Sequence, residues 1–117
     1  MSKTELTTES WLQVLTVEDI PILGARVVQA AVGPIAIFRN SENEIFAVLD
    51  KCPHKGGPLS QGIVHGKSVT CPLHSWNIEL SSGCAVPPDE GCAKSFQVKV
   101  DDGFIWLQIT EIIAVHE

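Results

Sequence analysis

Residues 52–74 read CPHKGGPLSQGIVHGKSVTCPLH, and this stretch contains two short segments of the same kind. The first segment is Cys52-Pro53-His54 and the second is Cys71-Pro72-Leu73-His74, with residues 55–70 between them. Each segment supplies one thiolate and one imidazole, and both groups are common ligands of transition metals. The pattern therefore predicts two loops that bind one metal centre between them.

The four predicted ligands fit two kinds of metal centre. In a Rieske [2Fe-2S] centre, two thiolates hold one iron and two imidazoles hold the other. Zinc accepts the same four groups in a tetrahedral site, but Cys2His2 zinc sites usually present a Cys pair followed by a His pair. Because each segment here is mixed, the order of the ligands favours an iron–sulfur cluster and electron transfer. A zinc-stabilised binding module is the remote alternative.

Glycine and proline residues next to the predicted ligands also suit a cluster. Gly56 and Gly57 allow the backbone to come close enough for its N–H groups to contact cluster sulfurs. Pro53 and Pro72 each follow a cysteine and bias that cysteine toward an extended backbone. Ordinary turns use the same residue types. Their repetition at both cysteines nevertheless favours two ligand loops over two unrelated turns.

The length of the chain limits what it does alone. Its 117 residues form one domain with its own core, too small to hold a Rieske module and a second catalytic domain. We expect a single domain over residues 1–117, with the cluster-binding loops at about residues 50–76 and no catalysis by the isolated chain. A membrane span or a signal peptide needs a long apolar run that the sequence lacks. We therefore expect a cytoplasmic protein.

The charge pattern narrows the class of partner. The net charge is −6, from 14 acidic and 8 basic residues, which argues against a nucleic-acid partner. Between residues 50 and 74 the charged side chains are Asp50, Lys51, Lys55 and Lys67, so this stretch is locally basic. A basic rim around the cluster would orient a partner protein. Three solvated loop lysines without a docking role are the other interpretation.

Short apolar runs separated by turn residues predict strands before the ligand loops. These runs lie at residues 26–30, 35–38 and 45–49. Gly33-Pro34 separates the first two runs, and the polar residues 40–43 separate the second from the third. A single helical turn is expected at residues 16–19, where a threonine cap is followed by acidic residues and by Pro21. The first half of the chain therefore reads as β-structure.

The second half of the chain also predicts strands. Phe96, Val98 and Val100 alternate with polar residues, as in a half-buried strand. Asp102-Gly103 then predicts a hairpin turn into a strand at residues 104–109. Together with the first half, this pattern predicts an all-β Rieske fold, a small antiparallel β-sandwich with a two-loop cluster-binding subdomain.

The residues between the ligand segments predict a further hairpin. It covers residues 59–70, with His65-Gly66-Lys67 at its tip, and a short strand is expected near residues 76–80. His65 is then a turn residue, and His116 is a tail residue. Because neither histidine has a neighbouring cysteine at a useful spacing, we expect both at the surface and neither as a ligand.

The stretch from Cys52 to Val100 resembles the small subunit of assimilatory NAD(P)H-dependent nitrite reductase. The segments that support the resemblance are C-P-H-K-G-G-P-L-S-Q-G, C-P-L-H-S-W, P-D-E-G-C and F-Q-V-K-V. Trp11 and residues 19–21, 23–26 and 35–39 are similar to the opening strands of that family. The ligand motif is common to Rieske proteins in general, and the segment Pro88-Asp89-Glu90-Gly91-Cys92 favours the nitrite reductase branch.

This resemblance implies a partner and a set of ligands. The partner is a larger subunit that contains FAD, a [4Fe-4S] cluster and sirohaem, in a complex that uses NAD(P)H to reduce nitrite to ammonium. Cys52 and Cys71 bind one iron of a single [2Fe-2S] cluster, and His54 and His74 bind the other. A free-standing Rieske ferredoxin of an aromatic-ring dioxygenase system shares the fold and the ligands, and it is the alternative function.

Departures from other Rieske branches predict the redox potential. High-potential members add a disulfide between the ligand loops and hydroxyl donors after the second histidine, but here Gly57, Leu73, Trp76 and Ile78 occupy those positions. Hydrogen bonds to the cluster sulfurs stabilise the reduced state, so their loss lowers the potential. We expect a value in the lower part of the Rieske range, roughly −150 to +300 mV. Pro87-Pro88 matches the position of the proline-bearing loop that Rieske folds place over the cluster, and a plain turn after Ser82-Gly83 is the other interpretation.

Two further cysteines, Cys84 and Cys92, lie after the ligand segments. Their spacing permits a disulfide across a short loop, but disulfides are rare in the cytoplasm. We therefore expect two buried thiols at these positions. A second cluster is not expected, because no other ligands lie near them.

Overall fold

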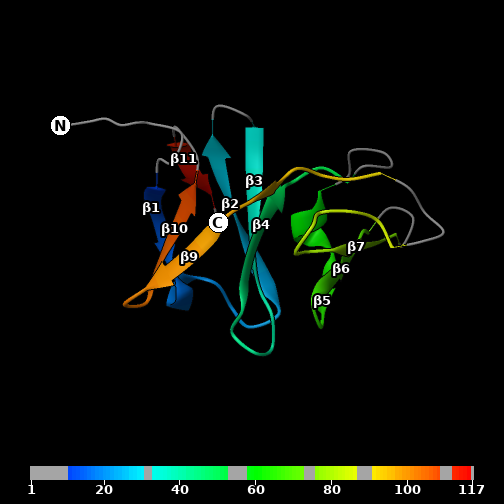
Figure 1. The fold of residues 1–117 in the computed structure, drawn as a ribbon, viewed down its shortest axis with the longest axis horizontal. Helices are drawn as coiled ribbons and strands as arrows, with labels where there is room; N and C mark the ends of the chain where they lie inside the picture. The colour runs from blue at the N-terminus through cyan, green and yellow to red at the C-terminus, as the bar shows by residue number, and fades with distance from the viewer. Residues whose placement is uncertain are drawn as a thin grey trace.

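The computed structural model describes residues 11–30, 33–52, 58–72, 76–86 and 91–108, together with the backbone of residues 112–116. Within these residues the chain forms antiparallel strands and two short 3-10 turns, and the described part contains no α-helix (Figure 1). No helical segment in it is long and apolar enough to cross a membrane. The all-β expectation is therefore confirmed.

Two sheets form the larger part of the molecule, at the left and in the middle of Figure 1. The five-stranded sheet has the order β11-β2-β3-β4-β8. Its strands are β2 (Gly24–Ala30), β3 (Gly33–Arg39), β4 (Ile45–Leu49), β8 (Ser95–Phe96) and β11 (Ile112–His116). The second sheet has the order β1-β10-β9. Its strands are β1 (Trp11–Thr16), β9 (Val98–Asp101) and β10 (Phe104–Gln108).

A third sheet lies at the right of Figure 1 and has the order β5-β6-β7. Its strands are β5 (Ile63–His65), β6 (Ser68–Thr70) and β7 (Asn77–Glu79), and the 3-10 turn η2 (Leu59–Gln61) precedes it. The predicted hairpin between the ligand segments is confirmed, with Gly66 and Lys67 at its tip. His65 was expected in the turn, but it is the last residue of β5 and pairs with Ser68. Gly66 adopts a φ of 59°, a left-handed conformation that glycine takes without strain.

Strand β3 is buried on both of its faces. Ile35 and Ile37 pack with Ile105 of β10 in the core between the first two sheets. Ala36 and Phe38 point to the opposite face and belong to the core that also contains the third sheet. A strand covered on both faces needs apolar residues at every position, which explains the unbroken run from residue 35 to residue 38.

Three sequence expectations about strand boundaries were wrong. The one strand expected from Phe96 to Val100 is divided at Gln97 into β8 of the five-stranded sheet and β9 of the second sheet. Gly33-Pro34 does not form the turn between the second and third strands, because both residues lie in β3 and pair with Ala30 and Gln29. Proline is tolerated at the beginning of a strand, where its missing N–H group matters least. His116 is not a tail residue either. It lies in β11, where the end of the chain pairs with β2.

The expected helical turn is confirmed as the 3-10 turn η1 (Val17–Asp19). One carboxylate oxygen of Asp19 accepts hydrogen bonds from the N–H group and the hydroxyl of Thr16, at 2.9 and 3.0 Å. These two bonds, with a smaller contribution from the positive charge of Arg26, hold the pKa of Asp19 below its usual range. The turn is also fixed from outside, because the Arg39 guanidinium donates to the carbonyl of Ile20 at 2.8 Å.

Candidate functional site

The first predicted thiolate, Cys52, comes directly after strand β4. A bend at Asp50 and Lys51 separates the cysteine from the strand. The bend is fixed by two backbone hydrogen bonds, from the Asp50 N–H to the Pro34 carbonyl and from the Lys51 N–H to the Leu49 carbonyl, each at 2.8 Å. The Cys52 side chain is 3% exposed. The first ligand segment therefore begins in the core, at the end of a buried strand.

The second predicted thiolate, Cys71, occupies an equivalent place after strand β6. Its N–H group donates to the carbonyl of Trp76 at 2.7 Å, which closes the second ligand segment onto the start of β7. Cys71 is 2% exposed. Both cysteines therefore follow a strand, and both are enclosed by the fold.

Cys52 and Cys71 belong to one apolar cluster. Its members include Phe38 of β3, Leu59 of η2 and Val69 of β6. The disulfide of this structure joins two other residues, so Cys52 and Cys71 are thiols. Two buried thiols in one cluster, each opening a loop, are the donor set that one iron of a [2Fe-2S] cluster requires. The structure therefore places both predicted thiolates in the same buried cluster, and their role as ligands is still a prediction.

Several sequence predictions fall outside the described residues. These are the imidazole ligands and their neighbours: Pro53, His54, Lys55, Gly56, Gly57, Leu73, His74, Pro87 and Pro88. In the part of the chain that is described, no three His, Cys, Asp or Glu side chains gather in a metal-binding group. The assignment of His54 and His74 as ligands is accordingly still a prediction.

An aspartate closes the first ligand segment. The Asp50 carboxylate accepts a hydrogen bond from the Ser60 N–H at 2.7 Å with one oxygen, and from the Ser60 hydroxyl at 2.8 Å with the other. Asp50 precedes Cys52, and Ser60 lies in η2 beyond the segment. The two-point contact therefore joins the two ends of the loop. The sequence offered one signal for it, because aspartate and serine often close turns in this way.

A chain of polar side chains crosses the third sheet beside the second ligand segment. The Thr70 hydroxyl donates to Asn77 Oδ1 at 2.6 Å and lies 2.7 Å from His65 Nε2. Thr70 immediately precedes Cys71, so these contacts fix the strand that leads to the ligand. His65 is exposed, as expected from the sequence. It contacts Thr70 across the hairpin, and sequence reasoning missed this chain.

The expectation of two buried thiols at Cys84 and Cys92 was wrong. These residues form a disulfide, and Cys92 is exposed while Cys84 is half-buried. The chain folds back after β7, so that Cys84 and Cys92 face each other in an isolated antiparallel bridge with Cα atoms 3.9 Å apart. The spacing of the two cysteines permitted a disulfide. The prediction of thiols was made because disulfides are rare in the cytoplasm.

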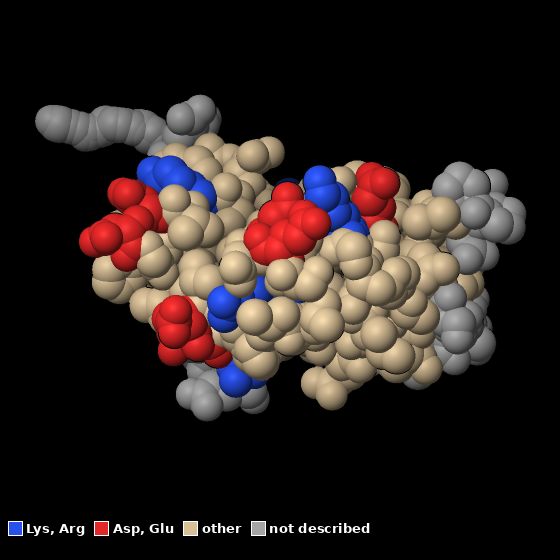
Figure 2. All heavy atoms as spheres, turned by 90° about the horizontal axis from the view of Figure 1, so that it is seen from below, with Lys and Arg blue, Asp and Glu red and all other residues tan. Residues whose placement is uncertain are grey.

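The charges near the site are mixed. Lys51 and Lys67 are exposed, but Lys67 Nζ lies 3.7 Å from Glu44 Oε2, so its charge is partly balanced. On the face that Figure 2 shows, the described charged side chains lie over the left and middle of the molecule, and the described surface to their right carries neither acidic nor basic residues. The described surface therefore gives little support to a basic docking rim.

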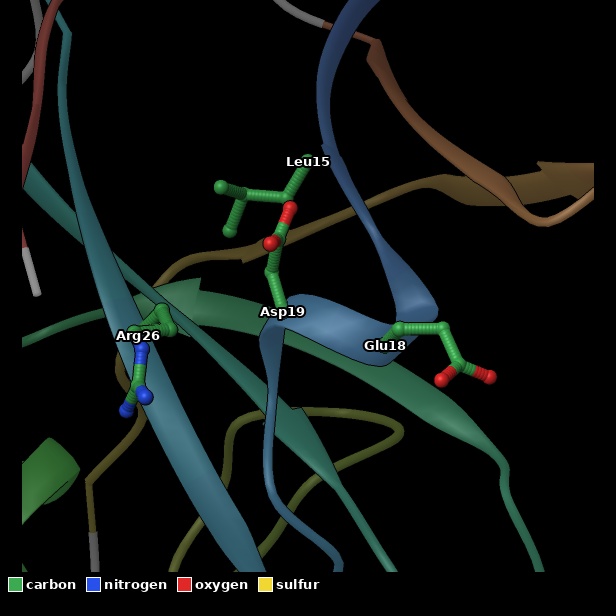
Figure 3. A pocket seen from close by; sticks show the side chains of 4 residues that line it. All are labelled: Leu15, Glu18, Asp19 and Arg26. Carbon is green, nitrogen blue, oxygen red and sulfur yellow. The ribbon is translucent and has the colours of Figure 1, made fainter.

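The cavity drawn in Figure 3 lies away from both thiols, beside η1 and β2. Its volume is about 320 Å³, and Leu15, Glu18, Asp19 and Arg26 line it. The charged groups do not converge. Asp19 is held by Thr16, the Glu18 carboxylate points away from Arg26, and the guanidinium donates to the Ala25 carbonyl at 3.0 Å. This cavity therefore lacks the convergent polar groups of a ligand site.

Comparisons with known proteins agree on the kind of domain that this chain forms. The profile of the Rieske [2Fe-2S] domain matches residues 10–97. The chain is 38% identical over 104 residues to the 3-phenylpropionate/cinnamic acid dioxygenase ferredoxin subunit of Photorhabdus laumondii, covering 87% of this chain and 97% of that protein. It is 35% identical over 83 residues to the 4beta-methylsterol monooxygenase of Methylococcus capsulatus, covering 62% of this chain. It spans only 22% of that longer enzyme.

Solved structures give the same fold. A structure from Mycobacterium tuberculosis, assigned as an NADH-dependent nitrite reductase small subunit, superposes with a TM-score of 0.78. The match covers 87% of this chain and 96% of that chain, with 19% sequence identity. At this level of identity the likeness concerns the fold alone. The fold of this chain therefore has a known counterpart.

Proposed function

Because this chain belongs to the Rieske [2Fe-2S] domain family, we propose that it is the electron-transfer subunit of an NAD(P)H-dependent nitrite reductase. The family binds a [2Fe-2S] cluster, and that group supplies one-electron chemistry when it is bound. Proteins of this kind work with a larger oxidoreductase or oxygenase. In our proposal the partner is a large subunit that contains FAD, a [4Fe-4S] cluster and sirohaem.

The observation that supports this function best is the pair of buried thiols, Cys52 and Cys71, in one apolar cluster. We assign these two residues to one iron and His54 and His74 to the other. The fold contributes a rigid, water-excluding position for the thiolates, because each cysteine follows a strand and is backed by core residues. Asp50 and Ser60 close the first loop, and the bond from Cys71 to Trp76 closes the second.

The core around the thiols also favours a low potential. Leu59, Val69 and Ile78 are fully buried in the same cluster as Cys52 and Cys71, and none of them has a polar side chain. An added electron brings a negative charge into this apolar surrounding, where charge is poorly stabilised. The residues next to the thiols therefore oppose reduction more than hydroxyl donors would.

Two electron-transfer systems are compatible with this site. The segment Pro88-Asp89-Glu90-Gly91-Cys92 and the opening strands support the nitrite reductase subunit. The second candidate is a ferredoxin that delivers electrons to an oxygenase, favoured by the 38% identity with a dioxygenase ferredoxin subunit over 97% of its length. Both candidates use the same ligands, so the partner distinguishes them.

The experiment that tests the proposal is reconstitution with each partner. The purified holoprotein is mixed with a nitrite reductase large subunit and NAD(P)H, and in parallel with a flavin reductase and a Rieske oxygenase. We expect nitrite-dependent oxidation of NAD(P)H that requires this chain, and co-purification with the sirohaem protein. Electron delivery to the oxygenase at a comparable rate, without a complex with the sirohaem protein, would favour the ferredoxin instead.

A further inference from the structure

The Cys84–Cys92 disulfide lies at the surface, outside the predicted ligand set. Cys92 is exposed and Cys84 is half-buried. They sit opposite each other in an isolated bridge between two irregular segments, not inside a sheet. Thiol–disulfide exchange needs an attacking thiolate to contact one of the sulfurs, and exposed disulfides allow that contact. The disulfide is therefore accessible to a reductant in the folded protein.

Hydrogen bonds connect this disulfide to strand β7, which follows the second ligand segment. The Glu79 N–H donates to the Cys84 carbonyl, and the Val86 N–H donates to the Asn77 carbonyl, each at 2.8 Å. Asn77 begins β7 and directly follows Trp76, whose carbonyl accepts the bond from Cys71. A short path of backbone contacts therefore leads from Cys84 to the second thiol ligand.

The other end of the disulfide segment is tied to strand β4. The Ala93 N–H donates to the Gly83 carbonyl, and the Leu49 N–H donates to the Lys94 carbonyl, each at 2.7 Å. Leu49 is the last residue of β4, and Cys52 follows it after the bend. Residues 83–86 and 91–94 thus bond to each other and to the strands next to both ligand segments, and the disulfide joins these two short segments.

We propose that the Cys84–Cys92 disulfide is a second redox site of this domain, which exchanges with a dithiol reductant and whose state changes the backbone contacts beside the ligand segments. The exchange itself does not depend on the proposed function. Its effect on the cluster rests on the assignment of Cys52 and Cys71 as ligands. The site accepts a pair of electrons, whereas the cluster site handles one electron at a time.

The exchange balances in two steps. A thiolate of the dithiol attacks Sγ of Cys92, which belongs to the more exposed of the two residues, and the bond between Cys84 and Cys92 breaks to release the Cys84 thiolate. The second thiolate of the reductant then attacks the mixed disulfide and releases Cys92. Two electrons pass from the dithiol to the protein, and two protons complete the new thiols. The Ser82 carbonyl oxygen lies 3.8 Å from Cys84 Sγ and is placed to accept a weak bond from its thiol.

The test uses the full-length holoprotein under anaerobic conditions. The protein is incubated with mixtures of reduced and oxidised dithiothreitol, quenched with iodoacetamide, and its alkylated cysteines are located by mass spectrometry. We expect Cys84 and Cys92 to become alkylated together in the folded protein, while Cys52 and Cys71 stay protected. Reduction that occurs only once urea has unfolded the chain would overturn the proposal, because the disulfide would then be a structural crosslink.

Amide hydrogen exchange tests the coupling independently of the cluster. We expect at least tenfold faster exchange at the N–H groups of Glu79 and Val86 in the reduced protein than in the oxidised protein. The double variant Cys84→Ser and Cys92→Ser serves as the control and should match the reduced protein with and without dithiothreitol. Unchanged exchange at both amides after full reduction would overturn the coupling. Absence of iron–sulfur absorption in untreated protein would overturn the proposed function and leave the alkylation result intact.

Discussion

Asn40 joins the larger part of the molecule to the third sheet through the backbone of Gly66. Its Nδ2 donates to the Gly66 carbonyl at 3.0 Å and to Glu44 Oε1 at 2.8 Å. Its Oδ1 accepts the N–H groups of Glu42 and Glu44, at 3.0 and 2.8 Å. Asn40 is 1% exposed and is the one buried polar side chain among the described residues. The side-chain amide of Asn40 therefore fixes the β3–β4 turn against the β5–β6 hairpin.

We predict that Asn40→Ala destabilises the protein by roughly 2 to 3 kcal/mol, because it leaves the Gly66 carbonyl and two turn amides without their partner. Ser41→Ala, at an exposed position in the same turn, should change stability by less than about 0.5 kcal/mol. Urea unfolding of both variants gives the comparison. Similar small losses in the two variants would mean that Asn40 does not hold the sheets together.

Gly83 and Gly103 have nearly the same φ angle but different surroundings, so the two glycines together test the effect of a close backbone contact. Their φ angles are 80° and 81°, so alanine is equally unfavourable for the backbone at both. A Cβ at Gly83 would collide with the carbonyl of Ala93, whereas the space around Gly103 is open. We predict a loss of about 1 to 2 kcal/mol for Gly103→Ala and at least about 3 kcal/mol for Gly83→Ala. Equal melting temperatures for the two variants would contradict this contact.

We expect the contact between Asp50 and Ser60 to slow the loss of the cluster, because it closes the first ligand loop. Asp50→Asn replaces one of the two acceptor oxygens with a donor, so the first ligand segment loses one of its two closing bonds. Residues that orient metal ligands typically affect affinity 10- to 100-fold, and we expect cluster loss about tenfold faster, measured by the decay of visible absorbance in the presence of a chelator. Lys51→Ala, an exposed neighbour, is the control and should decay at the wild-type rate.

The lowered pKa of Asp19 predicts a pH-dependent contribution to stability. Because the carboxyl has a lower pKa in the folded chain than in the unfolded chain, its ionised form favours folding above the unfolded value. That contribution disappears as the pH falls through the folded value. Asp19→Asn should therefore be less stable than the wild type at pH 7 and equally stable near pH 2 in urea unfolding. A difference that is constant with pH would contradict the contact with Thr16.

The sequence predicted the strands whose pattern is local. The run at residues 45–49 corresponds to β4 without change, and the Asp102-Gly103 turn lies between β9 and β10 as expected. The local pattern did not predict strands β1 and β11, because they exist through pairing with β10 and β2, which lie far away in the sequence. A segment near the end of a chain forms a strand when it pairs with the edge of a sheet. The residues of the segment alone do not show which edge is available.

The candidate site was partly predictable for a similar reason. Cys52 and Cys71 were predicted as ligands from their residue types and repeated spacing, and the structure places both in one buried cluster. The contact of Asp50 with Ser60 was not predicted, because it joins residues that come together only in the folded chain. The disulfide was missed because the fold-back after β7, which brings Cys84 opposite Cys92, cannot be read from spacing. The sequence therefore indicated which residues could bind a metal, but not which residues lie next to each other in the fold.

Electron paramagnetic resonance of the dithionite-reduced protein tests the central claim most directly. The wild type should give a Rieske-type signal, which is lost in His54→Ala and in His74→Ala and kept in His65→Ala, the control histidine in the same region of the chain. Mixed thiolate and imidazole ligation predicts this pattern. A signal that survives the loss of either His54 or His74, or a colourless wild-type protein that contains zinc, would contradict the assignment of Cys52, His54, Cys71 and His74 as the ligands of a [2Fe-2S] cluster.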